Sequence, residues 1–304
     1  MSKAKLMISP HIHCGQSTSG IMLDVLIALL PATVAGAVIF GWRALLVIAV
    51  CLISCVGFEA LFNLLAKKEQ TIMDLSAAVT GLLLALNLPA NVPLWQCVVG
   101  SLFAIVVVKC LFGGIGCNLV NPAIAARVFM LVAFAELATP AFPAVVDTVG
   151  GATPLAPDAT MPSLLDLFLG LRGGAIGETC AAALLLGGIY LIARRVITWH
   201  TTVCFVGGVF LLTLLISGNA GIALTHVLSG GLLLGAIFMA TDYVTTPITK
   251  WGRALFGIGC ALITVVIRMW GAYPEGVSFA ILLMNILTPY LDRLTRPKAL
   301  GGAK

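Results

Sequence analysis

The 304-residue chain is 60% hydrophobic and only 10% charged, with a mean hydropathy of +1.11. A soluble domain carries about 25% charged residues, so a chain of this length could not cover its surface with polar groups in water. The net charge of +5 does not indicate nucleic-acid binding, because the Lys and Arg residues lie between apolar runs and form no basic patch. We therefore expect an integral membrane protein that binds no nucleic acid.

Apolar segments follow a polar N-terminal stretch that ends in Ser17-Thr18-Ser19, residues that often start a helix. Ten of these segments have roughly the length that a membrane-spanning helix needs. The third ends at Asn87-Leu-Pro-Ala-Asn-Val-Pro93 and is short enough to be tilted or broken. The sequence thus predicts an all-α protein with about ten transmembrane helices, near residues 21–40, 44–65, 75–89, 96–112, 122–138, 177–193, 199–216, 223–241, 254–270 and 276–291.

The basic residues predict the orientation of these helices. If the N-terminus is cytoplasmic, all of the 17 Lys and Arg residues except Arg43, Arg172 and Arg268 fall at or near the inner face, as the positive-inside rule requires. The five tryptophans fall at predicted helix ends, where an amphipathic ring prefers to lie. Both termini are therefore expected in the cytoplasm, and the loop at 139–176 is expected on the extracytoplasmic side.

A short internal similarity indicates two repeats. Thr80-Gly-Leu-Leu-Leu-Ala85 in the third segment matches Gly230-Gly-Leu-Leu-Leu-Gly235 in the eighth. A shift of five helices is odd, so the second copy would cross the membrane in the opposite direction, as in inverted repeats. The predicted organisation is a cytoplasmic N-terminal segment, a first five-helix repeat, an extracytoplasmic loop, a second five-helix repeat and a cytoplasmic tail, at 1–20, 21–138, 139–176, 177–292 and 293–304.

Two carboxylates fall inside predicted spans, where charge is costly and usually faces a cavity, an ion path or a partner. Asp24 lies near the start of the first segment, where it could also simply favour the helix dipole. Glu59 lies about two turns from the inner end of the second segment, where it could instead extend toward Lys67 or Lys68. We retain both residues as candidates for an ion pathway.

Two polar loops have both a functional and a structural interpretation. In Gly113-Gly-Ile-Gly-Cys-Asn118-Leu-Val-Asn121-Pro122 the free amides could bind a polar ligand, but the pattern is also typical of a loop that caps a helix. Met239-Ala-Thr241-Asp242-Tyr-Val-Thr-Thr-Pro247 ends the eighth segment in polar groups and is favoured as a loop. His200 and His226 have no nearby Cys or carboxylate motif and are interpreted as structural.

The stretch from Asp147 to Ala156 contains Gly150, Gly151 and Ala152, which let another molecule approach the backbone closely. The next residue, Thr153, offers a hydroxyl and precedes a proline. Such a stretch suits a phosphate bound by backbone N–H groups, although an ordinary loop is the simpler interpretation of the spacing.

The cysteines indicate neither a disulfide framework nor a zinc site. Their number is odd, they form no Cys-x-x-Cys pair, and most lie within apolar runs. No metal site is therefore expected. The nine are Cys14, Cys51, Cys55, Cys97, Cys110, Cys117, Cys180, Cys204 and Cys260.

Several stretches together resemble the NqrB/RnfD family, which includes the D subunit of the Rnf complex and, more distantly, the B subunit of the sodium-pumping NADH:quinone reductase. The resemblance runs from about residue 9 to 292 in one order. It is carried by Ser9–His13, Met22–Ala32, Gly113–Ala123, Gly151–Ala156, Phe238–Asp242 and Pro274–Asn285.

This resemblance implies a bacterial inner-membrane subunit of a complex that couples electron transfer between ferredoxin and NAD to export of Na⁺ or H⁺. The family carries FMN linked through its phosphate to a threonine in a Ser/Thr-Gly-Ala-Thr motif, which maps onto Thr153. Gly150 stands where the family has Ser or Thr, a departure that bears on recognition by the flavin transferase, which normally makes the bond on the outer side. A second, non-covalent flavin, riboflavin, is compatible with the resemblance to the quinone reductase protein.

The resemblance assigns no catalytic acid, base or nucleophile to this chain, because the flavin performs the redox step and the protein positions it. The implied partners are the A, B, C, E and G subunits of the Rnf complex, the flavin transferase and membrane lipid. Two alternatives remain at this point: a solute channel or transporter built from inverted repeats without a redox cofactor, and a scaffold subunit whose loop carries nothing.

Overall fold

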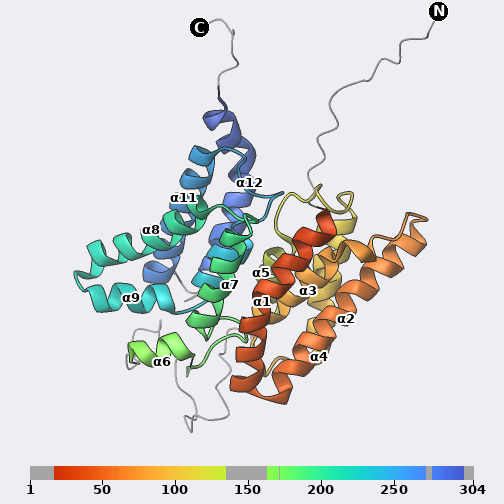
Figure 1. Ribbon diagram of the computed structural model, residues 1–304, viewed down its shortest axis with the longest axis horizontal. Coiled ribbons are helices and arrows are strands. Elements are labelled where there is room, and N and C mark those ends of the chain that lie inside the picture. Colours follow the sequence, from red (N-terminus) through yellow and green to blue (C-terminus); the bar gives the residue numbers. More distant parts are fainter. Residues whose placement is uncertain (1–16, 135–162, 171, 272–275, 298–304) are drawn as a thin grey trace, which may run out of the picture.

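The computed structural model describes residues 17–134, 163–170, 172–271 and 276–297. In these ranges every regular element is a helix, which confirms the all-α prediction (Figure 1). Five helices are long and apolar enough to cross a membrane: α1 (Thr18–Phe40), α2 (Trp42–Leu65), α8 (Trp199–Ser217), α11 (Lys250–Trp270) and α12 (Val277–Thr295).

The remaining helices are shorter or broken. Four apolar stretches are too short to cross by themselves: α3 (Ser76–Leu86), α4 (Leu94–Leu102) with its π-helical continuation η2 (Phe103–Cys110), α5 (Pro122–Ala133) and α7 (Ala181–Ala193). One further span is bent by 64° between α9 (Ala220–Leu228) and α10 (Leu232–Leu234), which continues as η4 (Gly235–Met239). Two small elements complete the described chain, η1 (Ile72–Asp74) and α6 (Leu164–Leu169).

Each of the ten predicted segments thus corresponds to a helix or to a bent helical pair. Their lengths differ from the prediction, because only five helices, or six if the bent pair counts as one span, are long enough to cross a membrane among the described residues. The multi-pass architecture holds, whereas ten crossings stay a prediction.

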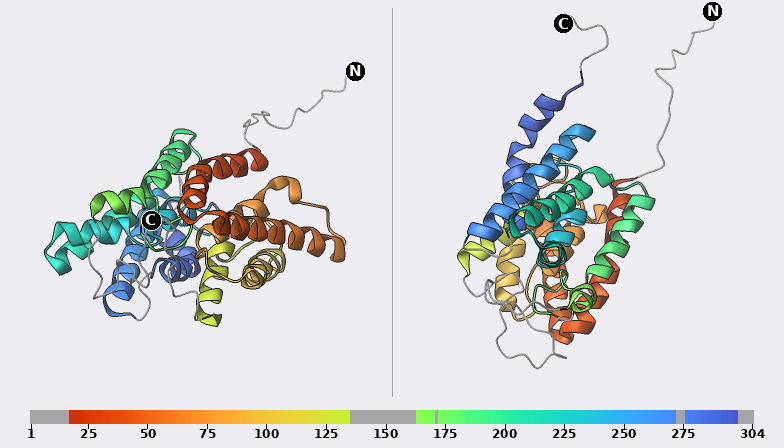
Figure 2. Two further views of the ribbon diagram at one scale, coloured as in Figure 1. Left: turned by 90° about the horizontal axis from the view of Figure 1, so that it is seen from below. Right: turned by 90° about the vertical axis from the view of Figure 1, so that its left-hand side faces the viewer.

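The helices pack in the same order in both halves of the chain. In the first half α2 contacts α3 and α4, and η2 contacts α5; in the second half α8 contacts α9 and α11, and α11 contacts α12. The two halves lie side by side and meet where α1 packs against α7 (Figures 1 and 2). These two helices run in opposite directions in Figure 1, which is the relation that inverted repeats require.

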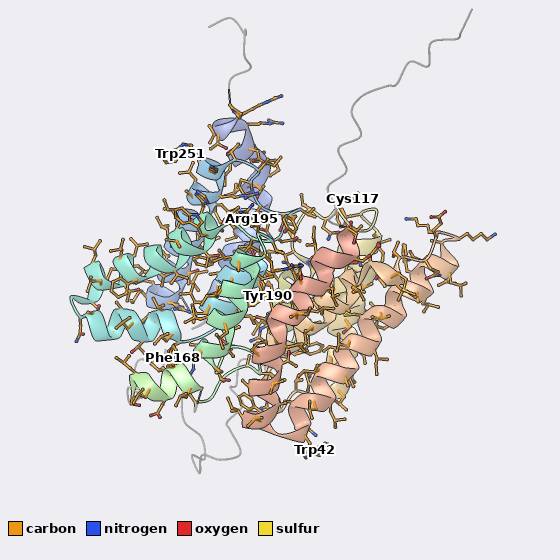
Figure 3. The ribbon with its side chains drawn as sticks, in the orientation of Figure 1. Trp42, Cys117, Phe168, Tyr190, Arg195 and Trp251 are labelled. Carbon is orange, nitrogen blue, oxygen red and sulfur yellow. The ribbon has the colours of Figure 1, made fainter. Side chains whose placement is uncertain are left out.

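Two opposite ends of the molecule can be recognised from labelled residues (Figure 3). Cys117, Arg195 and Trp251 lie at one end, called here the Trp251 end, where α1 also begins and α12 finishes. Trp42 and Phe168 lie at the other, called here the Trp42 end. The start of α1 and the end of α12 therefore lie at the same end of the molecule, in agreement with the distribution of the basic residues.

Two predicted helix starts have the expected caps. The Ser17 hydroxyl accepts a hydrogen bond from the Gly20 N–H at 3.1 Å and starts α1. The Asn121 carboxamide accepts from the N–H groups of Ala123 and Ile124, at 3.0 and 3.4 Å, and Pro122 follows as the first residue of α5.

A glycine allows α1 and α7 to pack closely. A Cβ atom at Gly187 would overlap the carbonyl oxygen of Ala28, so no other residue could occupy this position without moving one helix. Backbone approach of this kind is typical of helix pairs in membranes, and here it joins one helix from each half; α5 and α12 make a second contact between the halves.

Candidate functional site

The predicted flavin-attachment stretch lies outside the described residues. Gly150, Gly151, Ala152 and Thr153 all belong to the range 135–162, so this site stays a prediction. The helix that follows this range, α6, lies at the Trp42 end of the molecule, where Figure 3 labels Phe168.

Glu59 is deeply buried in α2, with an exposed fraction of 3%. Its Oε1 atom accepts hydrogen bonds from the Lys109 ammonium at 2.7 Å and from the Thr71 hydroxyl at 2.8 Å. Its second oxygen, Oε2, is buried and has no hydrogen-bond partner among the described residues. The carboxylate therefore does not extend toward Lys67 or Lys68, as one interpretation of the sequence allowed.

Lys109 is the partner that the sequence did not reveal. The charge pattern had only placed it at or near the inner face, whereas its exposed fraction in the structure is 2%. The ammonium donates to Glu59 and, at 2.7 Å, to the hydroxyl of Ser76 at the start of α3. Removing one partner of a buried ion pair typically costs about 3–5 kcal/mol, because the other charge is left uncompensated.

Asp24 links the first helices of the two halves. Its carboxylate accepts from the Tyr190 hydroxyl at 2.9 Å and from the Arg194 guanidinium at 3.2 Å, across the contact between α1 and α7. Because α1 begins at Thr18, Asp24 lies beyond the first turn, and the helix-dipole interpretation of this residue is wrong. The hydrogen bond to Asp24 raises the pKa of the exposed Arg194 above its usual value.

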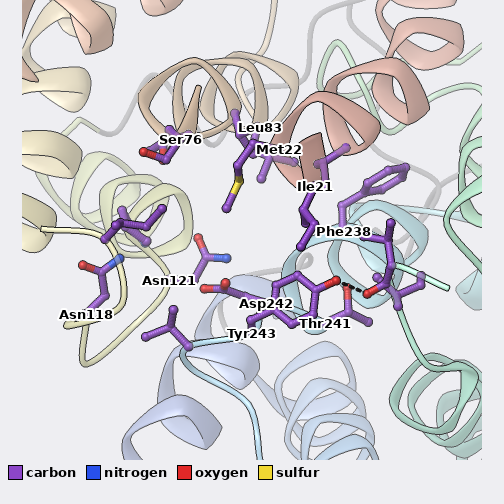
Figure 4. A pocket seen from close by; sticks show the side chains of 18 of the residues that line it. Ile21, Met22, Ser76, Leu83, Asn118, Asn121, Phe238, Thr241, Asp242 and Tyr243 are labelled. Carbon is purple, nitrogen blue, oxygen red and sulfur yellow. Dashed lines mark hydrogen bonds between the residues drawn. The ribbon is translucent and has the colours of Figure 1, made fainter. Parts of the chain in front are cut away.

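A cavity of about 100 Å³ lies between the two halves (Figure 4). Its apolar wall comes from α1, α3 and η4 and includes Met22, Val25, Leu83 and Phe238. Its polar wall joins the two loops that the sequence left with both interpretations, and it includes Ser76, Lys109, Asn118, Asn121, Thr241 and Asp242. The structure thus brings together residues that the sequence placed in separate, apparently ordinary loops.

The polar groups of the cavity differ in how well they are satisfied. Asn121 donates from its amide to the Met239 carbonyl at 3.4 Å, whereas Asn118 Oδ1 is buried without a hydrogen-bond partner among the described residues. The Asp242 carboxylate accepts from the Thr245 hydroxyl at 3.1 Å. Burial raises the pKa of the Asp242 carboxyl above its usual value, because a charge on this wall is poorly solvated.

Two buried arginines bind the end of the broken helix α9. The Arg172 guanidinium donates to the carbonyl oxygens of Glu178 and Leu228, at 2.7 and 2.8 Å. The Arg268 guanidinium donates to the carbonyls of His226 and Ser229. Both arginines had only been exceptions to the charge pattern in the sequence. In the structure they donate to carbonyl groups at the end of α9, where the bend leaves these carbonyls without intrahelical partners.

The described residues contain no group of three or more His, Cys, Asp or Glu side chains that could hold a metal ion. The cavity instead combines an apolar wall with carboxamide and carboxylate groups on another side. That combination suits an organic ligand with one polar edge.

Comparison with known proteins shows how widely this sequence pattern is shared. The profile of the family described as NQR2, RnfD, RnfE matches residues 5–301. The chain is 47% identical to the D subunit of the Na(+)-translocating ferredoxin:NAD(+) oxidoreductase complex of Acetobacterium woodii, with 97% of this chain and 95% of the relative covered. It is 40% identical to the D subunit of the proton-translocating ferredoxin:NAD(+) oxidoreductase complex of Clostridium ljungdahlii, with 96% and 95% covered.

A third relative has a more general name. The D subunit of the ion-translocating oxidoreductase complex of Stutzerimonas stutzeri is 41% identical, with 94% of this chain and 92% of the relative covered. Both the profile and these relatives span nearly the whole chain. The chain therefore belongs to the NQR2, RnfD, RnfE family.

Proposed function

We propose that this chain is a membrane subunit of a complex that couples electron transfer between ferredoxin and NAD to movement of Na⁺ or H⁺ across the bacterial inner membrane. The observation that carries the proposal is the 47% identity, over 97% of this chain, to a relative named as the D subunit of such a complex. Because a second relative at 40% identity is named as proton-translocating, similarity does not select the cation. The proposed partners are the A, B, C, E and G subunits of the Rnf complex, and membrane lipid.

The proposal includes a covalent FMN on Thr153. The Gly151-Ala152-Thr153 sequence supports it, since small residues leave room for backbone N–H groups around Gly150 to Ala152 to bind the phosphate. A flavin transferase would make the phosphoester bond at the Trp42 end, which we assign to the extracytoplasmic side from the charge pattern. The attached flavin would supply the electron-transfer chemistry, and Thr153 would act only as an anchor.

The cavity between the two halves is our proposed place for a second, non-covalent flavin such as riboflavin. The fit is chemical: Met22, Leu83 and Phe238 contribute apolar side chains for the ring, and Asn118 Oδ1 offers a buried acceptor for a ligand N–H group. Its volume of about 100 Å³ has room for one edge of the ring system, and the rest would occupy the mouth. The side chains would bind and orient the ring and exclude water.

We place Glu59 and Asp24 on the ion pathway. The support for Glu59 is its burial and its Oε2 atom, which lacks a hydrogen-bond partner among the described residues. Its partner Lys109 lines the same cavity. The support for Asp24 is weaker, because Tyr190 and Arg194 already bind its carboxylate at the contact between the two halves.

Flavin attachment can be tested in the complex purified from its native host. On a denaturing gel the wild-type subunit should fluoresce under ultraviolet light, and Thr153→Ala should abolish the band. The variant Thr148→Ala, in the same stretch, is the matched control and should fluoresce normally. Mass spectrometry should find the Thr153 peptide heavier by one flavin nucleotide.

An unmodified, non-fluorescent wild-type subunit from cells that contain the transferase would contradict this part of the proposal. It would favour the alternative of a solute channel or transporter without a redox cofactor. This alternative is supported by the matching order of helix packing in the two halves and by the cavity between them.

A further inference from the structure

The inference concerns Lys109 and rests on the proposed function of Glu59. The Lys109 ammonium lies between two acceptors, Glu59 Oε1 and Ser76 Oγ, each at 2.7 Å. All three residues are buried, with exposed fractions of 3% for Glu59, 2% for Lys109 and 7% for Ser76. The pair joins α2 to η2, so it connects elements that are separate in the sequence.

Lys109 also lines the cavity, and so do Asn118 and Asp242. Asn118 Oδ1 is buried and unpartnered among the described residues, and the Asp242 carboxylate lies on the same lining (Figure 4). A lysine ammonium on its flexible stem can move between neighbouring acceptors, unlike a planar guanidinium that binds a carboxylate with two hydrogen bonds. Asn118 and Asp242 are therefore the candidate acceptors for a second position of the Lys109 ammonium.

The two positions have opposite consequences for Glu59. While the ammonium stays on Oε1, the carboxylate is neutralised and has little remaining attraction for another cation. When the ammonium turns into the cavity, Glu59 becomes a buried, uncompensated charge that must take up a proton or a monovalent cation. The Thr71 hydroxyl, which donates a hydrogen bond to Glu59, lies close enough to provide a further oxygen ligand for such a cation.

We propose that Lys109 is a tethered counter-ion that occupies Glu59 between transport events, and that its movement toward Asn118 and Asp242 opens Glu59 to the transported cation. Lys109 is thus a positioning residue that acts through Glu59. Among the described residues, the thiols of Cys55 and Cys110 interact electrostatically with both Glu59 and Lys109, and Lys68 interacts with Cys110. The Asp242 carboxylate on the cavity lining is the acceptor toward which the ammonium would move, so Glu59 is the carboxylate that this movement leaves open.

The test uses the whole complex in inverted membrane vesicles, with ferredoxin-driven NAD reduction and cation uptake measured together. Lys109→Met removes the charge while keeping a long, flexible side chain, and Lys109→Arg keeps the charge but binds the carboxylate more rigidly. The exposed Lys67→Met is the matched control. Electron transfer should continue in both Lys109 variants, while the number of cations moved per electron should fall at least about tenfold.

The two variants should shift cation dependence in opposite directions. If the complex transports Na⁺, the KM for Na⁺ should fall in Lys109→Met and rise in Lys109→Arg, each by about tenfold. If it transports H⁺, the pH at which coupling is half lost should move up in Lys109→Met and down in Lys109→Arg. Loss of a neighbouring positive charge makes Glu59 hold its proton to higher pH.

A purely structural Lys109 would lower the amount of assembled complex without shifting the KM or the pH profile, and that result would overturn the inference. If Lys109→Met does not assemble, Lys109→Arg decides, since it retains the ion pair. The proposed ion pathway is tested separately by Glu59→Gln, which should uncouple transport from electron flow. If transport stays coupled in Glu59→Gln, Glu59 is not on the pathway. If Glu59→Gln uncouples transport but the Lys109 variants keep normal KM values, only the proposed role of Lys109 is rejected.

Discussion

Charged side chains inside this protein are bound in sets that join distant parts of the chain. Glu59 and Lys109 are 50 residues apart, and Asp24 and Arg194 are 170 residues apart. In an apolar medium a single charge is costly, so its partner must be supplied by packing. The sequence identified Asp24 and Glu59 as unusual from their apolar surroundings, but it held no local signal for their partners, because tertiary contacts create these pairs.

At the same scale, Asp242 should make stability depend on pH. Burial raises the pKa of its carboxyl in the folded protein, so the folded state holds the proton more tightly than the unfolded chain. The contribution of Asp242 to the free energy of unfolding is then greatest below the ordinary aspartate pKa of about 3.9. It is lost as the pH rises through the raised pKa of the folded protein. Asp242→Asn should flatten this part of the curve.

The measurement is the melting temperature in detergent between about pH 4 and pH 8. The wild type should lose more stability over this range than Asp242→Asn, and the exposed Glu69→Gln should follow the wild type. Parallel curves for the wild type and Asp242→Asn would show that folding does not raise the pKa of the Asp242 carboxyl.

Among the elements, the broken helix α9–α10 best separates what sequence could and could not predict. The predicted segment 223–241 overlaps α9, α10 and η4, because the apolar run continues through all three. The 64° bend was not predicted. The local sequence feature at the bend is Ser229-Gly230-Gly231, where Gly230 has a φ of +66°. The arginines that bind the end of α9, Arg172 and Arg268, are distant in the sequence and could not be inferred from it.

The role of these arginines gives a prediction for α9. Arg268→Gln removes a buried cation from the carbonyls of His226 and Ser229. Hydrogen bonds from charged groups contribute about 1.5–3 kcal/mol each, so the variant should lose about 3 kcal/mol and melt several degrees lower in detergent. Arg43→Gln, an exposed arginine, is the control. Equal melting temperatures for the two variants would mean that the break in α9 is stable without the guanidinium.

For the whole molecule, composition was sufficient to predict a helical membrane protein. The distribution of Lys and Arg was sufficient to predict that α1 begins and α12 ends on the same side. The cavity could not be predicted, because its lining comes from α1, α3, η4 and two loops that only packing brings together. Three of the stretches that carry the family resemblance line it, through Met22, Asn121 and Asp242. A fourth stretch reaches Asn121 through Asn285, whose carboxamide, once oriented to donate to the Thr245 carbonyl at 3.1 Å, accepts from the Asn121 N–H at 3.1 Å.

Orientation of the whole molecule can be tested with one native thiol. Cys117 is exposed and lies at the Trp251 end (Figure 3), which the positive-inside rule places in the cytoplasm. In a Cys14→Ser background, a membrane-impermeant maleimide should label Cys117 in inverted vesicles and not in intact cells. Cys117→Ser should abolish this labelling, because the other described cysteines are buried or only partly exposed.

The matched reporter for the opposite face is Ser163→Cys in the Cys14→Ser, Cys117→Ser background. Ser163 is exposed and caps α6 at the Trp42 end, so its thiol should be labelled in intact cells and protected in inverted vesicles. Labelling of both positions from the same side would contradict the arrangement of the two ends. Labelling of each from the side opposite to the expected one would keep the fold but invert it in the membrane, and the Thr153 stretch could then not meet a flavin transferase on the extracytoplasmic side.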